Sequence, residues 1–100
     1  MVQATIRMYS ATDGHVEIKG HAGDALVCAS VSTMVGSTLN VMSGAVANVV
    51  YDSGDVEFDV HFTDSIQMGA FEVLVEALEM LAESFCGRVG VTLEKPPVLG

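Results

Sequence analysis

The stretch VEFDVHF, residues 56–62, followed closely by FEVLVEALEMLAESF, residues 71–85, decides the fold class. In the first segment, apolar residues alternate with Glu57, Asp59 and His61, and this period of two predicts a strand with one buried face. In the second segment, apolar residues recur at spacings of three and four, which predicts an amphipathic helix. Four glutamates are expected on its solvent side: Glu72, Glu76, Glu79 and Glu83.

The N-terminal part of the chain repeats this strand signal twice. Residues 5–9 and 15–19 alternate between apolar and polar side chains, and Asp13-Gly14 predicts a tight turn between them. Residues 46–51 are mostly apolar and are expected to form a strand covered on both sides. Residues 89–93 alternate into a final strand.

The first helix along the chain is expected to begin after Asp24, which can cap it, and to run to about Ser43; the helix over residues 71–85 is then the second. The resulting order β-β-α-β-β-α-β predicts an α+β fold: a two-layer sandwich, with a mostly antiparallel sheet and two helices packed on one face. A length of 100 residues predicts a single domain over residues 1–100. The first helix is apolar on more than one face, so a homodimer is expected.

The composition narrows the classes of partner. Half of the residues are hydrophobic, as in globular proteins, but no run is long enough for a membrane span. The net charge of −9 disfavours direct nucleic-acid binding and suits a basic peptide or protein partner. The N-terminus shows no signal-peptide pattern, so we expect a cytoplasmic protein whose two cysteines are free thiols.

The residues most able to carry chemistry are His21 and Cys28. His21 lies in a glycine-flanked turn, and Cys28 falls in the first turn of the predicted helix. Helix starts carry unpaired N–H groups and a partial positive charge, which favour thiolate over thiol. A neighbouring imidazole can take the thiol proton, so the pair has the parts of a cysteine nucleophile and its base. A packing role for such a cysteine is the alternative.

The remaining candidate residues have simpler expected roles. Cys86 is expected to be buried near the end of the second helix, and His15 and His61 to lie on the polar faces of strands. A zinc site built from Cys28, His21, His61 and Cys86 is conceivable, but the sequence has no close-spaced pair of ligands. No metal and no cofactor is therefore expected.

The segment Gly20-His21-Ala22-Gly23, followed by Val27-Cys28-Ala29 and Ser32, resembles the signature of the Prp, or YsxB-like, family of ribosomal-processing cysteine proteases. The length and the order of elements are similar to that family from end to end. The resemblance implies a dimeric α+β fold in which a Cys and a His carry the catalysis. It also implies a role in ribosome biogenesis, the removal of an N-terminal extension from a large-subunit ribosomal protein.

Carried over by position, the resemblance makes Cys28 the nucleophile and His21 the base, with Ser32 matching a serine one helical turn beyond. The chain departs from the pattern in two places. The loop between His21 and Cys28 is shorter than is usual in the family, and the family's aspartate falls on Ala25 with Asp24 one position earlier. Asp24 then either holds His21 or caps the helix, and we favour the cap.

Two other functions compete with the cysteine protease. One is a non-catalytic, dimeric peptide- or protein-binding module of the same fold, in which the short loop leaves a groove for a partner. The other is a purely structural dimer with Cys28 packed in its interface. Backbone N–H groups near Cys28 are the expected means of polarising a scissile carbonyl in the protease.

Overall fold

The computed structural model describes residues 1–52 and 55–95. In it, the segments with alternating apolar residues form strands, and those with helical periodicity form helices. Their bounds are β1 (Val2–Met8), β2 (Asp13–Lys19), α1 (Ala25–Val41), a short 3-10 turn (Ser43–Ala45), β3 (Val46–Asp52), β4 (Asp55–His61), α2 (Ser65–Ser84) and β5 (Val89–Glu94). The predicted order and the α+β class are confirmed.

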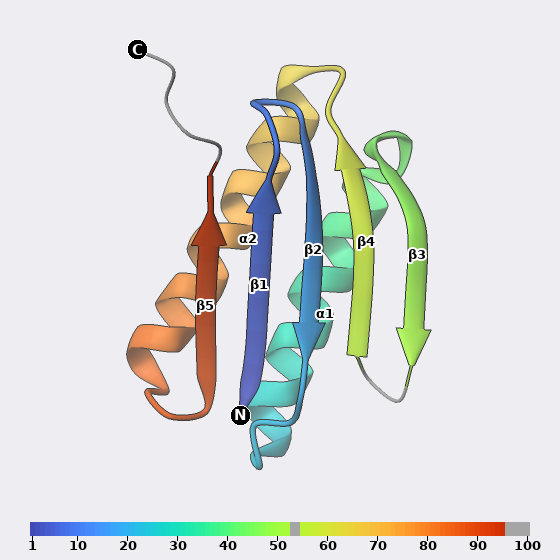
Figure 1. Cartoon of the computed structure of the whole chain (residues 1–100). Helices are drawn as coiled ribbons and strands as arrows, with labels where there is room; N and C mark the ends of the chain where they lie inside the picture. Colours follow the sequence, from blue (N-terminus) through green and yellow to red (C-terminus); the bar gives the residue numbers. More distant parts are fainter. Residues whose placement is uncertain (53–54, 96–100) are drawn as a thin grey trace.

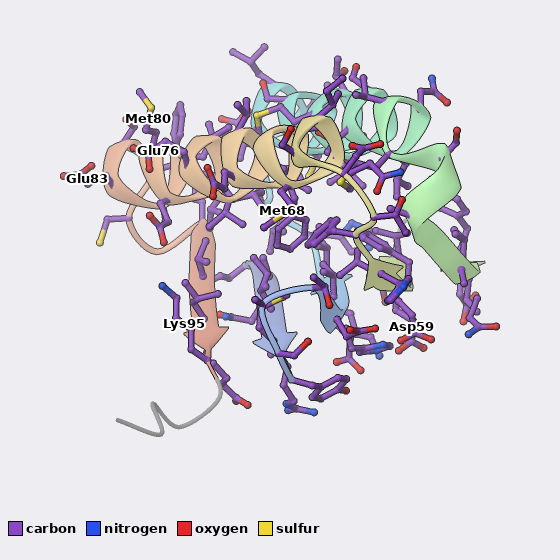
Figure 2. All side chains as sticks on the ribbon, turned by 90° about the horizontal axis from the view of Figure 1, so that it is seen from above. Asp59, Met68, Glu76, Met80, Glu83 and Lys95 are labelled. Carbon is purple, nitrogen blue, oxygen red and sulfur yellow. The ribbon has the colours of Figure 1, made fainter. Side chains whose placement is uncertain are left out.

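The strands form one mixed sheet in the order β3-β4-β2-β1-β5. Three neighbouring pairs are antiparallel, whereas β1 and β5 run parallel. Both helices cover the same face of the sheet, with α1 behind β2 and β4 and α2 behind β1 and β5 (Figure 1). Seen from above, the molecule has two layers and leaves the other face of the sheet without helices (Figure 2).

The core lies between these two layers. Alternate residues of the central strands point toward the helices, and one stripe of each helix points back. Phe58 and Leu78 are fully buried there. Their buried neighbours from the strands and helices include Ala4, Ile6, Val16, Ile18, Val27, Val31, Val35, Val56, Val60, Phe71 and Leu74. Among the described residues, no helix combines the length and hydropathy needed to cross a bilayer.

The predicted position of the first turn is wrong. Asp13 and Gly14 begin β2, and the turn spans residues 9–12. The Asp13 carboxylate closes this turn, because it accepts hydrogen bonds from the hydroxyls of Ser10 and Thr12. Gly14 is needed within the hairpin, since a Cβ there would lie 2.8 Å from the backbone carbonyl oxygen of Arg7, as well as against the sulfur of Met8.

The prediction that residues 46–51 form a strand covered on both sides is also wrong. β3 lies at the edge of the sheet, hydrogen-bonded only to β4 among the described strands, and six of its seven residues are exposed. Its register shifts between Ala47 and Val50, and Asn48 in this bulge adopts a left-handed conformation with φ of 55°. An apolar run cannot distinguish a central strand from an edge strand, and here the strand lies at the outer edge of the sheet with both of its faces exposed.

Candidate functional site

A short loop connects β2 to α1 and carries His21. The chain turns through it on two glycines in the left-handed region, Gly20 at φ of 97° and Gly23 at φ of 71°. Residues with a Cβ rarely adopt these angles. At Gly20 a Cβ would also collide with the carbonyl of Met1, so the glycines flanking His21 are required by the path of the backbone.

Two side chains from distant parts of the sequence hold this loop. The carboxylate of Asp55 accepts a hydrogen bond from the Gly20 amide at 2.9 Å. The guanidinium of Arg88 donates to the Ala22 carbonyl at 3.0 Å. Neither Asp55 nor Arg88 was a sequence candidate, because 35 and 66 residues separate the partners along the chain. The only hint in the sequence was that Arg88 is an isolated arginine in a chain with just four lysines and arginines.

Cys28 lies in the first turn of α1, as predicted, and its side chain is half-buried. The sulfur accepts a hydrogen bond from the Ala22 amide at 3.4 Å. The loop therefore directs a backbone N–H at the thiol, and such a donor stabilises negative charge on sulfur. The rest of the side chain packs against the hydrophobic core.

The His21 side chain is exposed to solvent. Within residues 1–52 and 55–95 its imidazole has no hydrogen bond and no ion pair. The loop thus brings the backbone amide of Ala22 to the Cys28 sulfur. His21 is the residue that precedes Ala22 in this loop. The two candidates lie at the same end of α1, and no hydrogen bond joins them within the described residues.

Asp24 caps α1, which is the alternative that the sequence favoured. One of its carboxylate oxygens accepts from the amides of Leu26 and Val27 at 2.9 and 3.2 Å. No hydrogen bond joins Asp24 to His21 in the part of the chain that the structure describes. Ser32 is exposed and likewise makes no described hydrogen bond, so its hydroxyl positions no neighbour here.

The cap changes which backbone N–H groups are free. The Cys28 amide donates to the Asp24 carbonyl at 3.0 Å, and the Asp24 carboxylate already engages the two preceding amides, those of Leu26 and Val27. The amides of Gly23, Asp24 and Ala25 have no acceptor among the described residues. The amides left free to donate are therefore those on the loop side of the helix start.

The prediction that Cys86 is buried is wrong. α2 ends at Ser84, and Cys86 lies exposed in the turn that follows, as a free thiol like Cys28. Gly87 in this turn has φ of 87°, and the chain turns back toward β5 at once, which leaves Cys86 no apolar surface to cover it. The conceivable zinc set that included Cys86 is not brought together in the described residues.

The other two histidines lie on the polar faces of strands, as predicted, and both make cross-strand contacts. His61 contacts the Asp13 carboxylate at 2.6 Å, and His15 contacts Asp59 at 2.6 Å and Glu57 at 2.9 Å. The hydrogen bond that His15 donates to Asp59 is the main cause that raises the pKa of His15 above its ordinary value. Partial burial opposes this shift, and the hydrogen bond to Glu57 adds to it.

An apolar groove that the sequence did not predict lies between α2 and the ends of β1 and β5. It encloses about 710 Å³. Its apolar lining comes from Met8, Phe62, Met68, Phe71, Val75 and Leu93. Its polar rim includes Glu72, Glu76, Glu79 and Lys95. Figure 2 shows Met68 at α2 and Lys95 at the β5 end of the sheet. The expectation that these glutamates face solvent is confirmed.

Arg88→Gln tests whether the guanidinium fixes the loop. Loss of its hydrogen bond to Ala22 costs roughly 1 kcal/mol locally. Amide hydrogen exchange of residues 20–23 is therefore expected to become about fivefold faster, while the global melting temperature changes little. Arg7→Gln, which removes an ion pair with Glu94 at the other end of the sheet, is the matched control. Unchanged exchange in the loop of Arg88→Gln would contradict the assignment.

Comparison with known proteins agrees with this geometry. The family model described as "Cysteine protease Prp" matches residues 1–89. No curated protein matches the chain. Among solved structures, a ribosomal processing protease Prp from S. aureus with a covalently linked product peptide is 21% identical, with a TM-score of 0.69, and the match covers 95% of this chain and 99% of that chain.

Two further structures share the fold. The same S. aureus protease with a substrate peptide is 17% identical, with a TM-score of 0.68 over 95% of this chain and 99% of that chain. SMU.848 from Streptococcus mutans is 24% identical, with a TM-score of 0.65 over 96% of this chain and 97% of that chain. Since the family model spans most of the sequence and the fold matches from end to end, the chain belongs to the Prp family of cysteine proteases.

Proposed function

We propose that this protein is a cytoplasmic cysteine endopeptidase that removes the basic N-terminal extension of a large-subunit ribosomal protein. Membership of the Prp family supports the reaction class. The observation that carries the proposal is the half-exposed sulfur of Cys28, which lies in the first turn of α1 and accepts the Ala22 amide. The related S. aureus protease, described as ribosomal processing, has been solved with substrate and product peptides.

In the proposed reaction His21 removes the proton from the Cys28 thiol, and the thiolate attacks the scissile carbonyl carbon. The resulting tetrahedral intermediate collapses to a thioester as the peptide C–N bond breaks, and the imidazolium returns its proton to the leaving amine. Water then attacks the thioester, with His21 as base, which releases the acid and restores the thiol. The exposure of His21 leaves its ring room to approach the sulfur when a substrate is bound.

The developing oxyanion requires N–H donors that are not already engaged. The amides of Gly23, Asp24 and Ala25 meet this condition in the described residues. They lie on the loop side of Cys28, where the partial positive charge of the α1 N-terminus also acts. We assign oxyanion stabilisation to this group. Ser32 is assigned a supporting position one helical turn beyond the nucleophile, as in the family signature.

The charge of the protein supports a basic substrate. Thirteen acidic and four basic residues give a net charge of −9, which accelerates encounter with a positively charged peptide. The outer surface of the helical layer supports a homodimer, because large apolar side chains stand exposed on both helices. These are Leu26 and Val41 on α1 and Ile66, Val73 and Met80 on α2.

The experiment incubates the full chain with synthetic peptides that span the N-terminal extension and cleavage junction of a bacterial large-subunit ribosomal protein. We expect a single cleavage detected by mass spectrometry, and a rate that falls as salt is raised. His21→Gln should lower the rate by about a hundredfold or more, because general base catalysis is lost. Peptide binding without any product, in wild type and variant alike, would instead establish the non-catalytic binding module.

A further inference from the structure

The face of the sheet that carries no helix holds a compact cluster of one imidazole and three carboxylates. His15 and Glu17 lie on β2, and Glu57 and Asp59 lie on β4. In the antiparallel register His15 pairs with Asp59 and Glu17 pairs with Glu57, so all four side chains meet on one face. Figure 2 shows Asp59 on the side of the strands away from the helices. The cluster is therefore separate from Cys28, which belongs to the helical layer.

The hydrogen bonds of His15 aim one of its nitrogens at two of the carboxylates. Its Nδ1 lies 2.6 Å from an oxygen of Asp59. Its Nε2 lies 2.9 Å from an oxygen of Glu57 and 3.5 Å from an oxygen of Glu17. When Nδ1–H donates to Asp59, Nε2 faces two negative groups, whose charge either a proton on Nε2 or a bound cation can balance.

Like charges oppose each other directly in this cluster. Glu17 and Glu57 are cross-strand partners, and such pairs are destabilising unless a positive charge lies between them. Arg7, which faces His15 from β1, is engaged by Glu94 at 2.8 Å. Within the described part of the chain, no lysine or arginine forms an ion pair with either glutamate. Arg7 acts on Glu17 only through longer-range attraction, so a proton on His15 or a bound ion is what can place positive charge directly between the two glutamates.

A second layer of contacts orients the imidazole. Asn48, in the left-handed bulge of β3, donates its side-chain amide to Asp59 at 2.8 Å. This hydrogen bond, followed by that of His15, lowers the pKa of Asp59 and keeps it ionised. A carboxylate that holds the far nitrogen of a histidine is the usual outer-shell partner of a metal-binding imidazole. Here Asn48 fixes Asp59, and Asp59 fixes His15.

We propose that His15 Nε2, Glu17 and Glu57 bind a divalent transition-metal ion, with Zn²⁺ the best match to this mixed nitrogen and oxygen set. One ligand atom from each residue lies within 4.8 Å of the other two. Donors around a tetrahedral zinc ion lie about 3.3–3.6 Å apart, so the observed 2.9 and 3.5 Å separations need only a small opening. The three side chains are partly exposed, which lets an ion enter from solvent and leaves a position for water. The bound ion would cross-link β2 and β4 at the centre of the sheet.

The test titrates the metal-free full chain with zinc sulfate. Calorimetry measures the dissociation constant, and the imidazole nitrogen resonances of His15 report where the ion binds. Zinc is expected to shift the His15 Nε2 resonance and to raise the melting temperature. Asp59→Asn should weaken binding by about 10–100-fold through loss of the outer-shell contact, and His15→Gln by at least as much.

The matched control is His61→Gln. His61 lies on β4 beside the cluster and also contacts a carboxylate, that of Asp13, but has no facing glutamate pair. Its replacement should leave zinc affinity within twofold of wild type. Glu57→Gln gives a second ligand variant should His15→Gln fold poorly. Equal affinity in wild type and ligand variants, or a His15 Nε2 resonance that does not move at saturating zinc, would overturn the proposal. Any zinc bound would then be held by the cysteine thiols, and a proton on His15 would balance the two glutamates.

Discussion

Replacing Cys28 by alanine is expected to lower kcat/KM for peptide cleavage by at least about a thousandfold while the fold remains intact. The sulfur supplies the nucleophile that attacks the peptide carbonyl in the proposed reaction, and alanine leaves no atom to form the thioester. The side chain is half-buried, so the loss of one sulfur atom from its surroundings costs little stability. A fluorogenic peptide spanning the junction measures the rate, and circular dichroism measures the fold.

Cys86→Ala is the matched control for this experiment. It removes the second free thiol, which lies exposed beyond the end of α2. Its activity should equal that of wild type. Retention of full activity in Cys28→Ala would remove the protease proposal. Loss of activity in Cys86→Ala would show that the nucleophile has been assigned to the wrong cysteine.

The largest loss of stability is expected from Phe58→Ala. Phe58 is fully buried on β4 against the helical layer. Truncation of a buried phenylalanine typically costs about 3–5 kcal/mol, through lost burial and the cavity left behind. In a domain of this size the melting temperature should fall by at least about 12 °C. Denaturant unfolding monitored by circular dichroism provides the free energy.

Tyr9→Ala serves as the control for Phe58→Ala, because Tyr9 is an aromatic residue exposed in the first turn. Its replacement should change the free energy of unfolding by no more than about 0.5 kcal/mol. A loss below about 1 kcal/mol for Phe58→Ala would mean that the sheet and helices do not pack as described. The main hydrophobic core would then lie elsewhere in the molecule.

The clearest strand and helix of the chain were predictable because each carries a single strong period. Residues 56–61 of the alternating segment lie in β4, and the glutamate-lined pattern of residues 71–85 falls within or directly after α2. Residues 46–51 carry no period, so the sequence could not reveal that β3 is an exposed edge strand. The position of the first turn was missed because Asp13 closes a longer turn through side-chain hydrogen bonds.

The local parts of the candidate site were also predictable. Asp24 caps α1, and the glycines flanking His21 allow the left-handed turns of the loop. The groups that fix this loop from outside could not be predicted, because Asp55 and Arg88 reach it only through the folded sheet. The cluster around His15 could likewise be predicted only in part. Its strand positions follow from alternation, but the facing of Glu17 and Glu57 depends on the register of β2 against β4.

The rate of alkylation of the two thiols tests the central claim most directly. Native protein is treated briefly with iodoacetamide near neutral pH, and each cysteine is quantified by mass spectrometry. Exposure alone favours Cys86, which is exposed, over the half-buried Cys28. We predict the reverse order, with Cys28 reacting several-fold faster and losing this advantage in His21→Gln. Faster labelling of Cys86, with Cys28 unreactive until the protein unfolds, would contradict the assignment of Cys28 as an activated nucleophile.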